Sequence, residues 1–335
     1  MSWATTAIEQ LRHQLGCRRS VTFAKLDRRF SLAAAARARV TSSHLFLYSP
    51  YAWEAFTARY QHTPKKILFQ FHPHPDMERR ILQEDSIKYP FVRHSFEEET
   101  GEHVNDDLKQ RGRDSWMHAD LVLCASSFTR RSLVEAGADA SLCKVIPYGI
   151  DVTNENTDLA ISDRFDALFV GAGAQRKGLH HLLLAWQKSA LPANSILTLV
   201  CRAIDPEIET LAKQISNVRL IRGLDPDQLK NLFKISTILV MPSLVEGFGQ
   251  VYLEALAQGC PVLGTANTGL PDLCGYGRAI WQVEPGQIDQ MVSVLETVSR
   301  TLPGNPKVRG DARACAAQWP WARFRCGIRS ALKNN

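Results

Sequence analysis

The sequence predicts an α/β protein with parallel sheets, arranged as two Rossmann-like domains that face a cleft. Two observations carry this prediction. Short apolar segments rich in β-branched residues alternate with helical segments along the chain, a pattern typical of parallel sheets built from right-handed crossovers. A polar, turn-rich segment at 151–163 lies between two such runs, and 335 residues are enough for two domains of ordinary size.

The first half begins with helical spacing and then alternates. Ile8, Leu11 and Leu15 lie on one face of a helix predicted over 5–15. The segments expected after it are a weak strand at 21–26, an Ala-rich helix to about residue 40, strands that begin at His44, Lys65, Asp120 and Lys144, a helix at 53–60, and a helix that ends at Ala136 before Gly137.

The second half repeats the alternation with clearer patterns. The predicted strands are 167–173, 196–202, 218–223 and 238–242, and the predicted helices are 178–186, 206–215, 226–235 and 287–301. After a break at 302–306 that contains Pro and Gly, a last helical segment is expected over 311–333. We therefore assign 1–150 to a first domain, 164–310 to a second domain and 311–335 to a helical tail.

The composition is that of an ordinary globular protein, with 45% hydrophobic and 22% charged residues. No apolar run approaches the length of a membrane span, and the first residues lack the hydrophobic core of a signal peptide. We therefore expect a cytoplasmic protein. The eight cysteines occur singly and without the spacing of a zinc site, which favours reduced core residues.

The net charge is +6, and basic side chains gather within the first forty positions. They are Arg12, Arg18, Arg19, Lys25, Arg28, Arg29, Arg37 and Arg39. This group could contact anionic lipid at the inner face of the membrane or an acidic acceptor, although we favour a solvated helical face. Nucleic acid is not expected as a partner, because the charges lack the regular interleaving with aromatic residues that stacks bases.

The most informative stretch, Ser243–Thr265, is predicted to form a loop, a helix and a strand, fed by the buried strand at 238–242. Seven residues separate Glu246 from Glu254 in it, around a Gly-Phe-Gly turn. Free N–H groups at the start of the helix, beside glycines that allow close approach, make an anion site that fits a diphosphate. Two carboxylates that flank such a site indicate a ligand with hydroxyl groups, and this describes a nucleotide diphosphate sugar.

The stretch Ser243–Thr265, with the NTGLPDL segment at 267–273 after it, resembles the Glu-x7-Glu donor motif of retaining family 4 glycosyltransferases, which have the GT-B fold. The alternative is that any α/β domain can carry a Gly-rich turn before a helix. Here strand, turn, both glutamates, helix and following strand all agree with the family pattern, so we favour the resemblance.

The resemblance implies an acceptor-side N-terminal domain, a C-terminal domain that binds a nucleotide sugar, and a tail that returns to the first domain. It further implies metal-independent, retaining transfer of a hexosyl-type sugar from a UDP or GDP donor, without a cofactor, to a hydroxyl of a glycan, lipid-linked or small-molecule acceptor. Polysaccharide biosynthesis would be one such setting. The resemblance fails ahead of His44, where the family usually carries several more βα units. We therefore expect a shortened first domain, or else a chain start that lies downstream of the native one.

The resemblance also assigns roles to residues of the donor site. Glu246 would hold hydroxyls of the donor sugar and Glu254 the ribose. The diphosphate would lie on the amides of the Gly-Phe-Gly turn. The other positions assigned to the donor are Gly171, Gly247, Phe248, Gly249, Gly269 and Leu270, with Arg202 and Arg222 at the strand ends that frame the base.

The loop at 171–178 distinguishes a nicotinamide dehydrogenase from a glycosyltransferase. A dinucleotide fingerprint would require Gly at the position of Arg176, so a nicotinamide dehydrogenase is disfavoured. The family places an Arg at the position of Ala172 and a Lys at the position of Lys177, both to neutralise the departing diphosphate. Lys177 fits this pattern, and we suggest that Arg176 supplies the missing charge, with a solvent-facing side chain as the alternative.

Two histidines follow the strand that begins at Lys65, in the sequence Phe-His-Pro-His-Pro. The carboxyl ends of parallel strands are where doubly wound sheets bind ligands, and many family members have a histidine there that touches the donor sugar. His72 and His74 are the candidates, and a structural role in the loop is the alternative for each.

Two other functions remain open. A catalytically weak protein of the same fold could bind a nucleotide sugar or glycan as a scaffold, which the short first domain and Ala172 favour. A nucleotide-sugar epimerase is the third candidate, and it would convert donor without acceptor.

Overall fold

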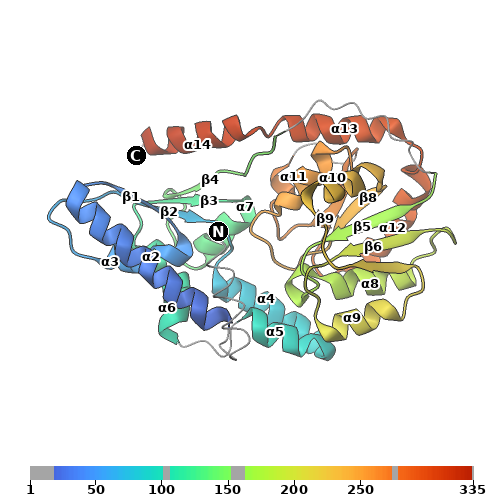
Figure 1. Cartoon of the computed structure of the whole chain (residues 1–335), viewed down its shortest axis with the longest axis horizontal. Coiled ribbons are helices and arrows are strands. Elements are labelled where there is room, and N and C mark those ends of the chain that lie inside the picture. Colours follow the sequence, from blue (N-terminus) through green and yellow to red (C-terminus); the bar gives the residue numbers. More distant parts are fainter. Residues whose placement is uncertain (1–18, 101–105, 152–162, 274–277, 334–335) are drawn as a thin grey trace.

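The computed structural model describes residues 19–100, 106–151, 163–273 and 278–333, and each half of the chain contains one parallel sheet (Figure 1). The predicted α/β class with two Rossmann-like domains is confirmed. The helix predicted at 5–15 and most of the predicted linker lie outside the described residues.

The N-terminal sheet has four strands in the order β1-β2-β3-β4. They are β1 (Leu45–Tyr48), β2 (Lys66–Gln70), β3 (Leu121–Cys124) and β4 (Cys143–Val145). The helices of this half are α2 (Arg19–Thr41), α3 (Trp53–Thr57), α4 (Pro75–Lys88), α5 (Arg93–Glu99), α6 (Asp106–Asp114) and α7 (Ser127–Glu135), with short 3-10 turns η1 (Ser49–Tyr51), η2 (Pro90–Val92) and η3 (Ser115–His118). One face of the sheet packs against α2 and α3 in a small core that includes Phe56 and Leu68.

The C-terminal sheet has six parallel strands in the order β10-β9-β8-β5-β6-β7. They are β5 (Asp166–Val170), β6 (Ile196–Val200), β7 (Val218–Ile221), β8 (Ile238–Met241), β9 (Val262–Thr265) and β10 (Ile280–Val283). The helices are α8 (Leu179–Lys188), α9 (Pro206–Lys213), α10 (Pro226–Ile235), α11 (Gln250–Ala257) and α12 (Ile288–Thr301), with the 3-10 turns η4 (Gln175–Lys177) and η5 (Leu270–Asp272). All the strands predicted in this half are present, and β10 was missed.

The tail forms two helices, α13 (Pro306–Ala317) and α14 (Trp321–Lys333), rather than the single segment predicted over 311–333. Asn305 caps α13 by accepting from two backbone N–H groups, so the helix begins earlier than expected. Pro320 ends the first helix and precedes the second. Figure 1 shows α14 along the N-terminal sheet, where the rings of Phe324 and Phe69 lie 6.0 Å apart.

The weak strand predicted at 21–26 is wrong, because these residues belong to α2. No Gly or Pro interrupts the helical spacing here, and the helix packs against α3 through the buried Ala35, Ala38 and Ser31, whose hydroxyl accepts from the N–H of Ala55 at 2.9 Å. Tertiary contacts of the later turns thus hold the whole segment helical.

The cysteines agree with the expectation of reduced core residues at five described positions. Cys124, Cys143, Cys201, Cys260 and Cys315 are buried thiols. For the last helix the expectation is wrong, because Cys326 is exposed.

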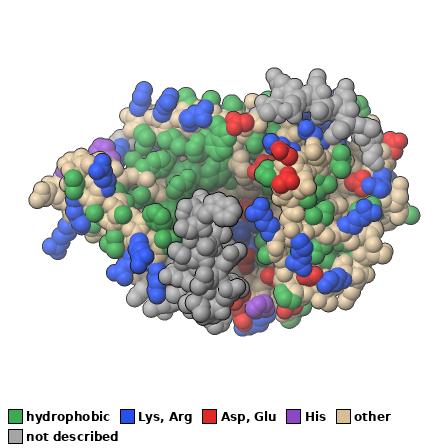
Figure 2. All heavy atoms as spheres, in the orientation of Figure 1, with side chains coloured by type: hydrophobic (Ala, Val, Ile, Leu, Met, Phe, Trp, Pro, Cys, Tyr) green, Lys and Arg blue, Asp and Glu red, His purple; other side chains and the backbone are tan. Residues whose placement is uncertain are grey.

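The molecular surface combines an apolar area with basic side chains. Figure 2 shows hydrophobic side chains gathered over the N-terminal sheet, below a row of basic side chains along α14. Phe46 and Tyr48 of β1 are 45% and 46% exposed. No helix among the described residues is both long and apolar enough to cross a bilayer.

Candidate functional site

The predicted loop, helix and strand at 243–265 form as expected. The backbone conformation and close packing explain why glycine occupies two positions in the loop. Gly249 precedes α11 with φ of 85°, a left-handed conformation that favours glycine. A Cβ on Gly247 would lie 1.8 Å from the carbonyl oxygen of Phe71, so no other residue fits there. The Gly-Phe-Gly turn therefore touches the loop that follows β2 in the N-terminal half.

Residues at the start of α7 hold the same turn from the N-terminal side. The carbonyl of Gly247 accepts from the hydroxyl of Ser126 and, at 3.2 Å, from that of Thr129. The N–H of Ser127 donates to Asp272 at 2.8 Å, close to η5. The two halves thus contact one another directly around the predicted donor site.

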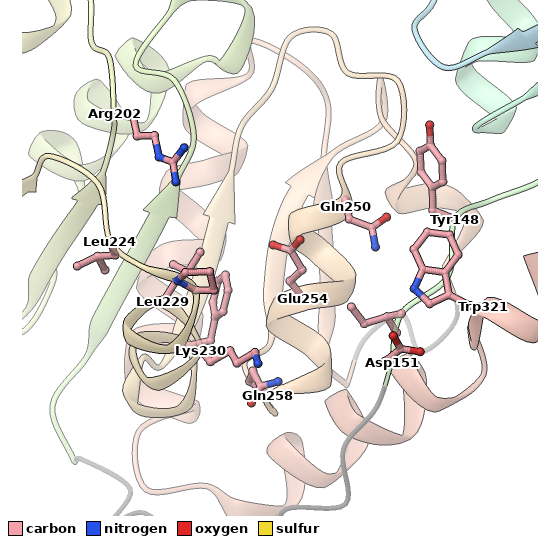
Figure 3. A pocket seen from close by; sticks show the side chains of 13 residues that line it. Tyr148, Asp151, Arg202, Leu224, Leu229, Lys230, Gln250, Glu254, Gln258 and Trp321 are labelled. Atoms are coloured by element: carbon pink, nitrogen blue, oxygen red, sulfur yellow. The ribbon is translucent and has the colours of Figure 1, made fainter. Parts of the chain in front are cut away.

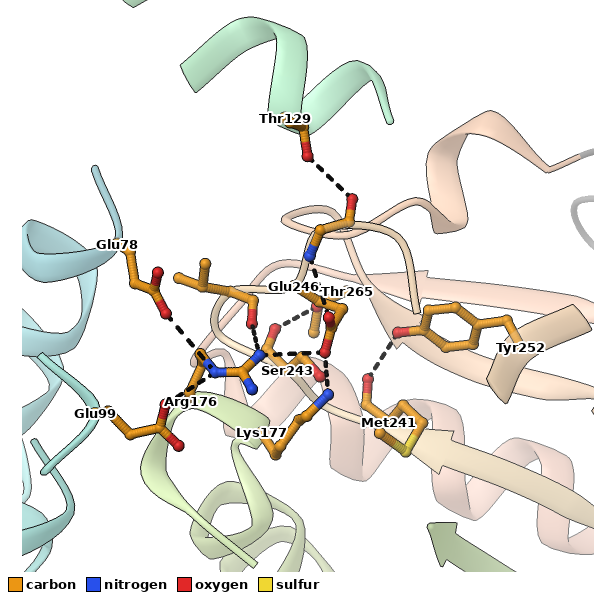
Figure 4. Close-up of polar contacts among 12 residues, drawn as sticks. Glu78, Glu99, Thr129, Arg176, Lys177, Met241, Ser243, Glu246, Tyr252 and Thr265 are labelled. Atoms are coloured by element: carbon orange, nitrogen blue, oxygen red, sulfur yellow. Dashed lines mark hydrogen bonds and ion pairs between the residues drawn. The ribbon is translucent and has the colours of Figure 1, made fainter. Parts of the chain in front are cut away.

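Glu246 is the centre of a buried charge cluster (Figure 4). Its carboxylate contacts the amine of Lys177 and lies 3.3 Å from the guanidinium of Arg176. Burial alone would raise the pKa of Glu246, but Lys177 and Arg176 outweigh burial and lower it to about 2. The carboxylate is therefore ionised and neutralises the cations of the loop at 171–178.

Arg176 does not face solvent, because its side chain is only 16% exposed. It contacts three carboxylates: Glu78 at 3.7 Å, Glu99 at 3.0 Å and Glu246 at 3.3 Å. Glu78 and Glu99 come from α4 and α5 of the N-terminal half, so Arg176 joins both halves at the cluster. Sequence reasoning missed both glutamates, since nothing in their local pattern distinguishes them from solvated helix residues.

The two candidate histidines have different surroundings. Burial and then the charge of Arg176 lower the pKa of His72 to about 4, so His72 is a neutral imidazole near the cluster. His74 caps α4. Its Nδ1 accepts from the backbone N–H of Asp76 at 3.3 Å, and the backbone N–H of His74 donates to the hydroxyl of Ser132 at 2.8 Å. These contacts give His74 a structural role. His72 lies near the charge cluster and stays the candidate for contact with substrate.

Glu254 faces a separate cavity of about 780 Å³ (Figure 3). The cavity is lined by polar and aromatic side chains from both halves and the tail, among them Tyr148, Arg202, Lys230, Gln250, Glu254 and Trp321. Burial raises the pKa of Glu254. The cavity is large enough for a nucleoside, and it offers a carboxylate for hydroxyls together with aromatic surfaces and Arg202.

Three other predicted donor residues, Arg222, Gly269 and Leu270, have partners within the protein. Arg222 forms an ion pair with Glu209 at 2.6 Å and does not line the cavity. The N–H groups of Gly269 and Leu270 donate to Phe248 and Thr268 within the protein, at 2.8 and 3.0 Å.

The two remaining donor positions, Gly171 and Phe248, have their partners within the protein. The N–H of Gly171 donates to Val200 at 3.0 Å, at the end of β5. The side chain of Phe248 is buried against the ring of Tyr148, 5.5 Å away between centroids. Gly171 and Phe248 thus contribute to the shape of the site through contacts within the protein.

One acidic pattern escaped the sequence reasoning. Asp225 and Asp227 form an Asp-x-Asp pair, a spacing that can hold a divalent cation. In the structure the carboxylate of Asp225 accepts from the N–H groups of Asp227 and Gln228 at 3.0 and 2.8 Å. The pair therefore caps α10, and it does not join the charge cluster.

The buried carboxyl of Glu78 gives a prediction about pH and stability. Burial raises the pKa of Glu78 from 4.5 to about 7, with Arg176 opposing and Glu99 adding to the rise. A raised folded-state pKa stabilises the fold below the unfolded-state pKa, and this contribution is lost as the pH rises through about 7. At pH 8 we expect the free energy of unfolding of Glu78→Gln to exceed that of the wild type by about 1–3 kcal/mol, so that the variant unfolds at a higher temperature, and we expect little gain at pH 5.

Thermal unfolding at both pH values tests this prediction. Glu135→Gln is the matched control, because Glu135 is 48% exposed and pairs only with surface arginines among the contacts found. An equal difference between Glu78→Gln and wild type at pH 5 and pH 8 would contradict the raised pKa.

Solved structures define the class of the fold. The chain superposes on Anabaena Alr3699/HepE in complex with UDP and glucose with a TM-score of 0.66, 19% identity, and coverage of 91% of this chain and 81% of that one. Sucrose-phosphate synthase from Thermosynechococcus elongatus gives a TM-score of 0.62 and 20% identity, over 91% and 77% of the two chains. The two facing parallel sheets and these neighbours show the GT-B fold.

Residues 151–301, somewhat less than half of the chain, match the family described as Glycosyl transferases group 1. D-inositol 3-phosphate glycosyltransferase of Corynebacterium jeikeium (strain K411) is 29% identical over 188 residues, 48% of this chain and 45% of the relative. MMP alpha-(1->4)-mannosyltransferase of Mycolicibacterium hassiacum is 25% identical over 52% of this chain and 44% of the relative. The chain thus spans about half the length of these curated relatives.

Proposed function

We propose that this protein is a glycosyltransferase that moves a sugar from a nucleotide diphosphate donor, of the UDP or GDP type, to a hydroxyl acceptor. The observation that carries the proposal is the buried cluster of Glu246, Lys177 and Arg176 beside the start of α11. Glu254 faces a nucleoside-sized cavity on the same helix. A nucleotide sugar would extend from the cavity to the cluster. The complexes with UDP and UDP-glucose among the structural neighbours support a ligand of this kind.

The proposed reaction is metal-independent and retaining, as in family 4. The bond between the anomeric carbon and the β-phosphate oxygen breaks, the acceptor oxygen attacks the same face, and its proton passes to the departing phosphate. Lys177 and Arg176 would neutralise the negative charge that develops on the diphosphate, where stabilisation has the greatest effect on rate. Glu246 would orient the sugar through its hydroxyls, with His72 beside it. The acceptor would be a glycan, lipid-linked or small-molecule hydroxyl.

A thermal-shift screen over UDP, GDP and ADP sugars tests the donor, because a ligand that binds only the native state stabilises it. Transfer and donor hydrolysis are then measured with the sugar that binds. Release of nucleoside diphosphate supports the proposal. Binding without turnover across donors and acceptors favours the scaffold alternative, and conversion of the donor sugar without acceptor favours the epimerase.

The cavity residue Glu254 gives a prediction about binding. Glu254→Gln keeps the shape of the side chain but removes a charged acceptor for ribose hydroxyls, and charge-assisted hydrogen bonds are about twice as strong as neutral ones. We expect the dissociation constant of the nucleoside diphosphate to rise about tenfold, with a smaller effect on kcat. Isothermal titration calorimetry measures the change, and Glu284→Gln, at an exposed position after β10, is the control. Equal affinities in both variants would remove Glu254 from the site.

A further inference from the structure

A second buried polar cluster lies beside the charge cluster and joins the two halves of the chain. Its centre is Asp85, on α4 of the N-terminal half. The carboxylate accepts from the side-chain N–H of Gln175 at 2.8 Å, and the Nε2 atoms of His180 and His181 lie 3.0 and 2.8 Å from its two oxygens. All four side chains are buried, and the last three belong to the C-terminal half.

The contacts indicate an ionised carboxylate held by polar side chains. Burial alone would raise the pKa of Asp85, but the contacts with His180 and His181 outweigh it and hold that pKa well below its usual range. Burial lowers the pKa of His180 to about 4, against the influence of Asp85. The other groups that face this cluster are the ring of Tyr89, edge-on to both imidazoles, and the ring of Phe91.

Asp85, His180 and His181 form the group among the described residues that could hold a metal ion. Their arrangement nevertheless favours hydrogen bonding over metal binding. The two imidazoles face different oxygens of the carboxylate. Within the described part of the chain, neither Nδ1 atom has a hydrogen-bond partner, and the Nε2 of His181 lies 2.8 Å from Asp85 without the geometry of a hydrogen bond, whereas that of His180 has it. A metal on Nε2 would require a proton on each Nδ1, and ligating histidines almost always donate that proton to a partner.

Gln175 connects this cluster to the proposed donor site, because it directly precedes Arg176 and Lys177 in the turn η4. Its side chain also donates to the carbonyl of Leu82 at 2.8 Å, and its backbone N–H donates to the hydroxyl of Ser95 at 2.8 Å. At the other end of the turn, Gly178 has a φ of 65°. It packs so closely on Pro242 that a Cβ added at this position would lie 2.0 Å from the carbonyl oxygen of Pro242. The turn that carries both cations is therefore fixed at its two ends.

We propose that Asp85 is a positioning residue, which holds the turn η4 through Gln175 and the two imidazoles and so places Lys177 against the departing diphosphate. This inference rests on the proposed function. It assigns to the N-terminal half a role in catalysis that is separate from acceptor binding, because a carboxylate of α4 sets the geometry of a cation in the other half. Misplacing a catalytic group by about 1 Å can lower the rate by about 100-fold.

A double-mutant cycle tests the proposal on the full chain with the donor found by the thermal-shift screen. Asp85→Asn is expected to lower kcat about tenfold or more with little change in KM, because the lost interaction acts in the transition state. In a Lys177→Ala background the same change is expected to have almost no further effect on kcat, since the cation that Asp85 positions is absent. Glu84→Gln, exposed on the same helix, is the control and should behave as wild type in both backgrounds.

Each other result of the cycle has a defined meaning. Additive losses in an active enzyme would overturn positioning and leave only a structural role. Stoichiometric metal in the purified protein, lost in Asp85→Asn, would overturn the hydrogen-bonded arrangement. A wild type without turnover on any donor would overturn the proposed function, and the positioning role with it. If Asp85→Asn does not fold, Gln175→Ala removes the hydrogen bonds from the turn to Asp85 and to Leu82 and keeps the carboxylate, and it should show the same non-additivity with Lys177→Ala.

Discussion

Replacing Lys177 with alanine is expected to lower kcat by about 100-fold or more, with a smaller rise in KM. The side chain of Lys177 is 17% exposed, and its amine contacts Glu246 at the point where the diphosphate would leave. Removing one preorganised group that stabilises developing negative charge typically costs about 100- to 1,000-fold in kcat. The effect falls on kcat because the charge on the diphosphate grows between ground state and transition state.

Steady-state transfer, or donor hydrolysis if no acceptor is known, measures this prediction. Lys188→Ala is the matched control, because Lys188 lies on the following helix and forms an exposed ion pair with Asp289. An unchanged kcat with a raised KM would show that Lys177 contributes only uniform binding, which would contradict its proposed role.

Replacing Glu246 with glutamine is expected to have effects of opposite sign on turnover and on product binding. Turnover should fall by about 100-fold, since the variant loses the charged acceptor for the donor sugar and leaves both cations less precisely held. The affinity for free nucleoside diphosphate should rise several-fold, because the diphosphate no longer competes with Glu246 for Lys177 and Arg176.

Calorimetry with the nucleoside diphosphate and steady-state kinetics measure the two effects. Glu254→Gln is the informative comparison, because it should weaken the binding that Glu246→Gln strengthens. Weaker binding in both variants would mean that Glu246 does not neutralise the cations of the loop in the free enzyme. A fall in thermal stability is also expected, since removing one partner of a buried ion pair is destabilising.

Local patterns were sufficient for most of the fold. The strand at 238–242, the Gly-rich turn, the helix that follows and the strand at 262–265 form where the sequence predicts them. Each has a local cause: apolar β-branched runs, a helical stripe, and glycine at 249 and 259 with positive φ. The weak strand at 21–26 and the single tail helix were wrong, because packing against α3 decides the first and caps at Asn305 and Pro320 decide the second.

The candidate site was predictable only in its donor half. Glu246, Lys177 and Arg176 meet in one buried cluster and Glu254 lines the cavity, while the ligand roles assigned to them stay predictions. Arg222 forms an ion pair with Glu209 and does not line the cavity, so the structure gives its predicted contact with the base no support. Glu78, Glu99 and Asp85 were not predictable, since their helices carry no motif and their role arises from contact with the other half.

The sequence by itself determined the class of fold, the two-sheet organisation and the motif that points to a nucleotide sugar, because backbone propensity and short-range spacing specify these locally. Only the tertiary structure decided which charges meet. Arg176 and Lys177 face Glu246 across about seventy positions of sequence, and Arg176 and Gln175 meet carboxylates of the other half. Such contacts depend on the relative placement of two separately folded sheets, and burial then sets the strength and the pKa of every group in them.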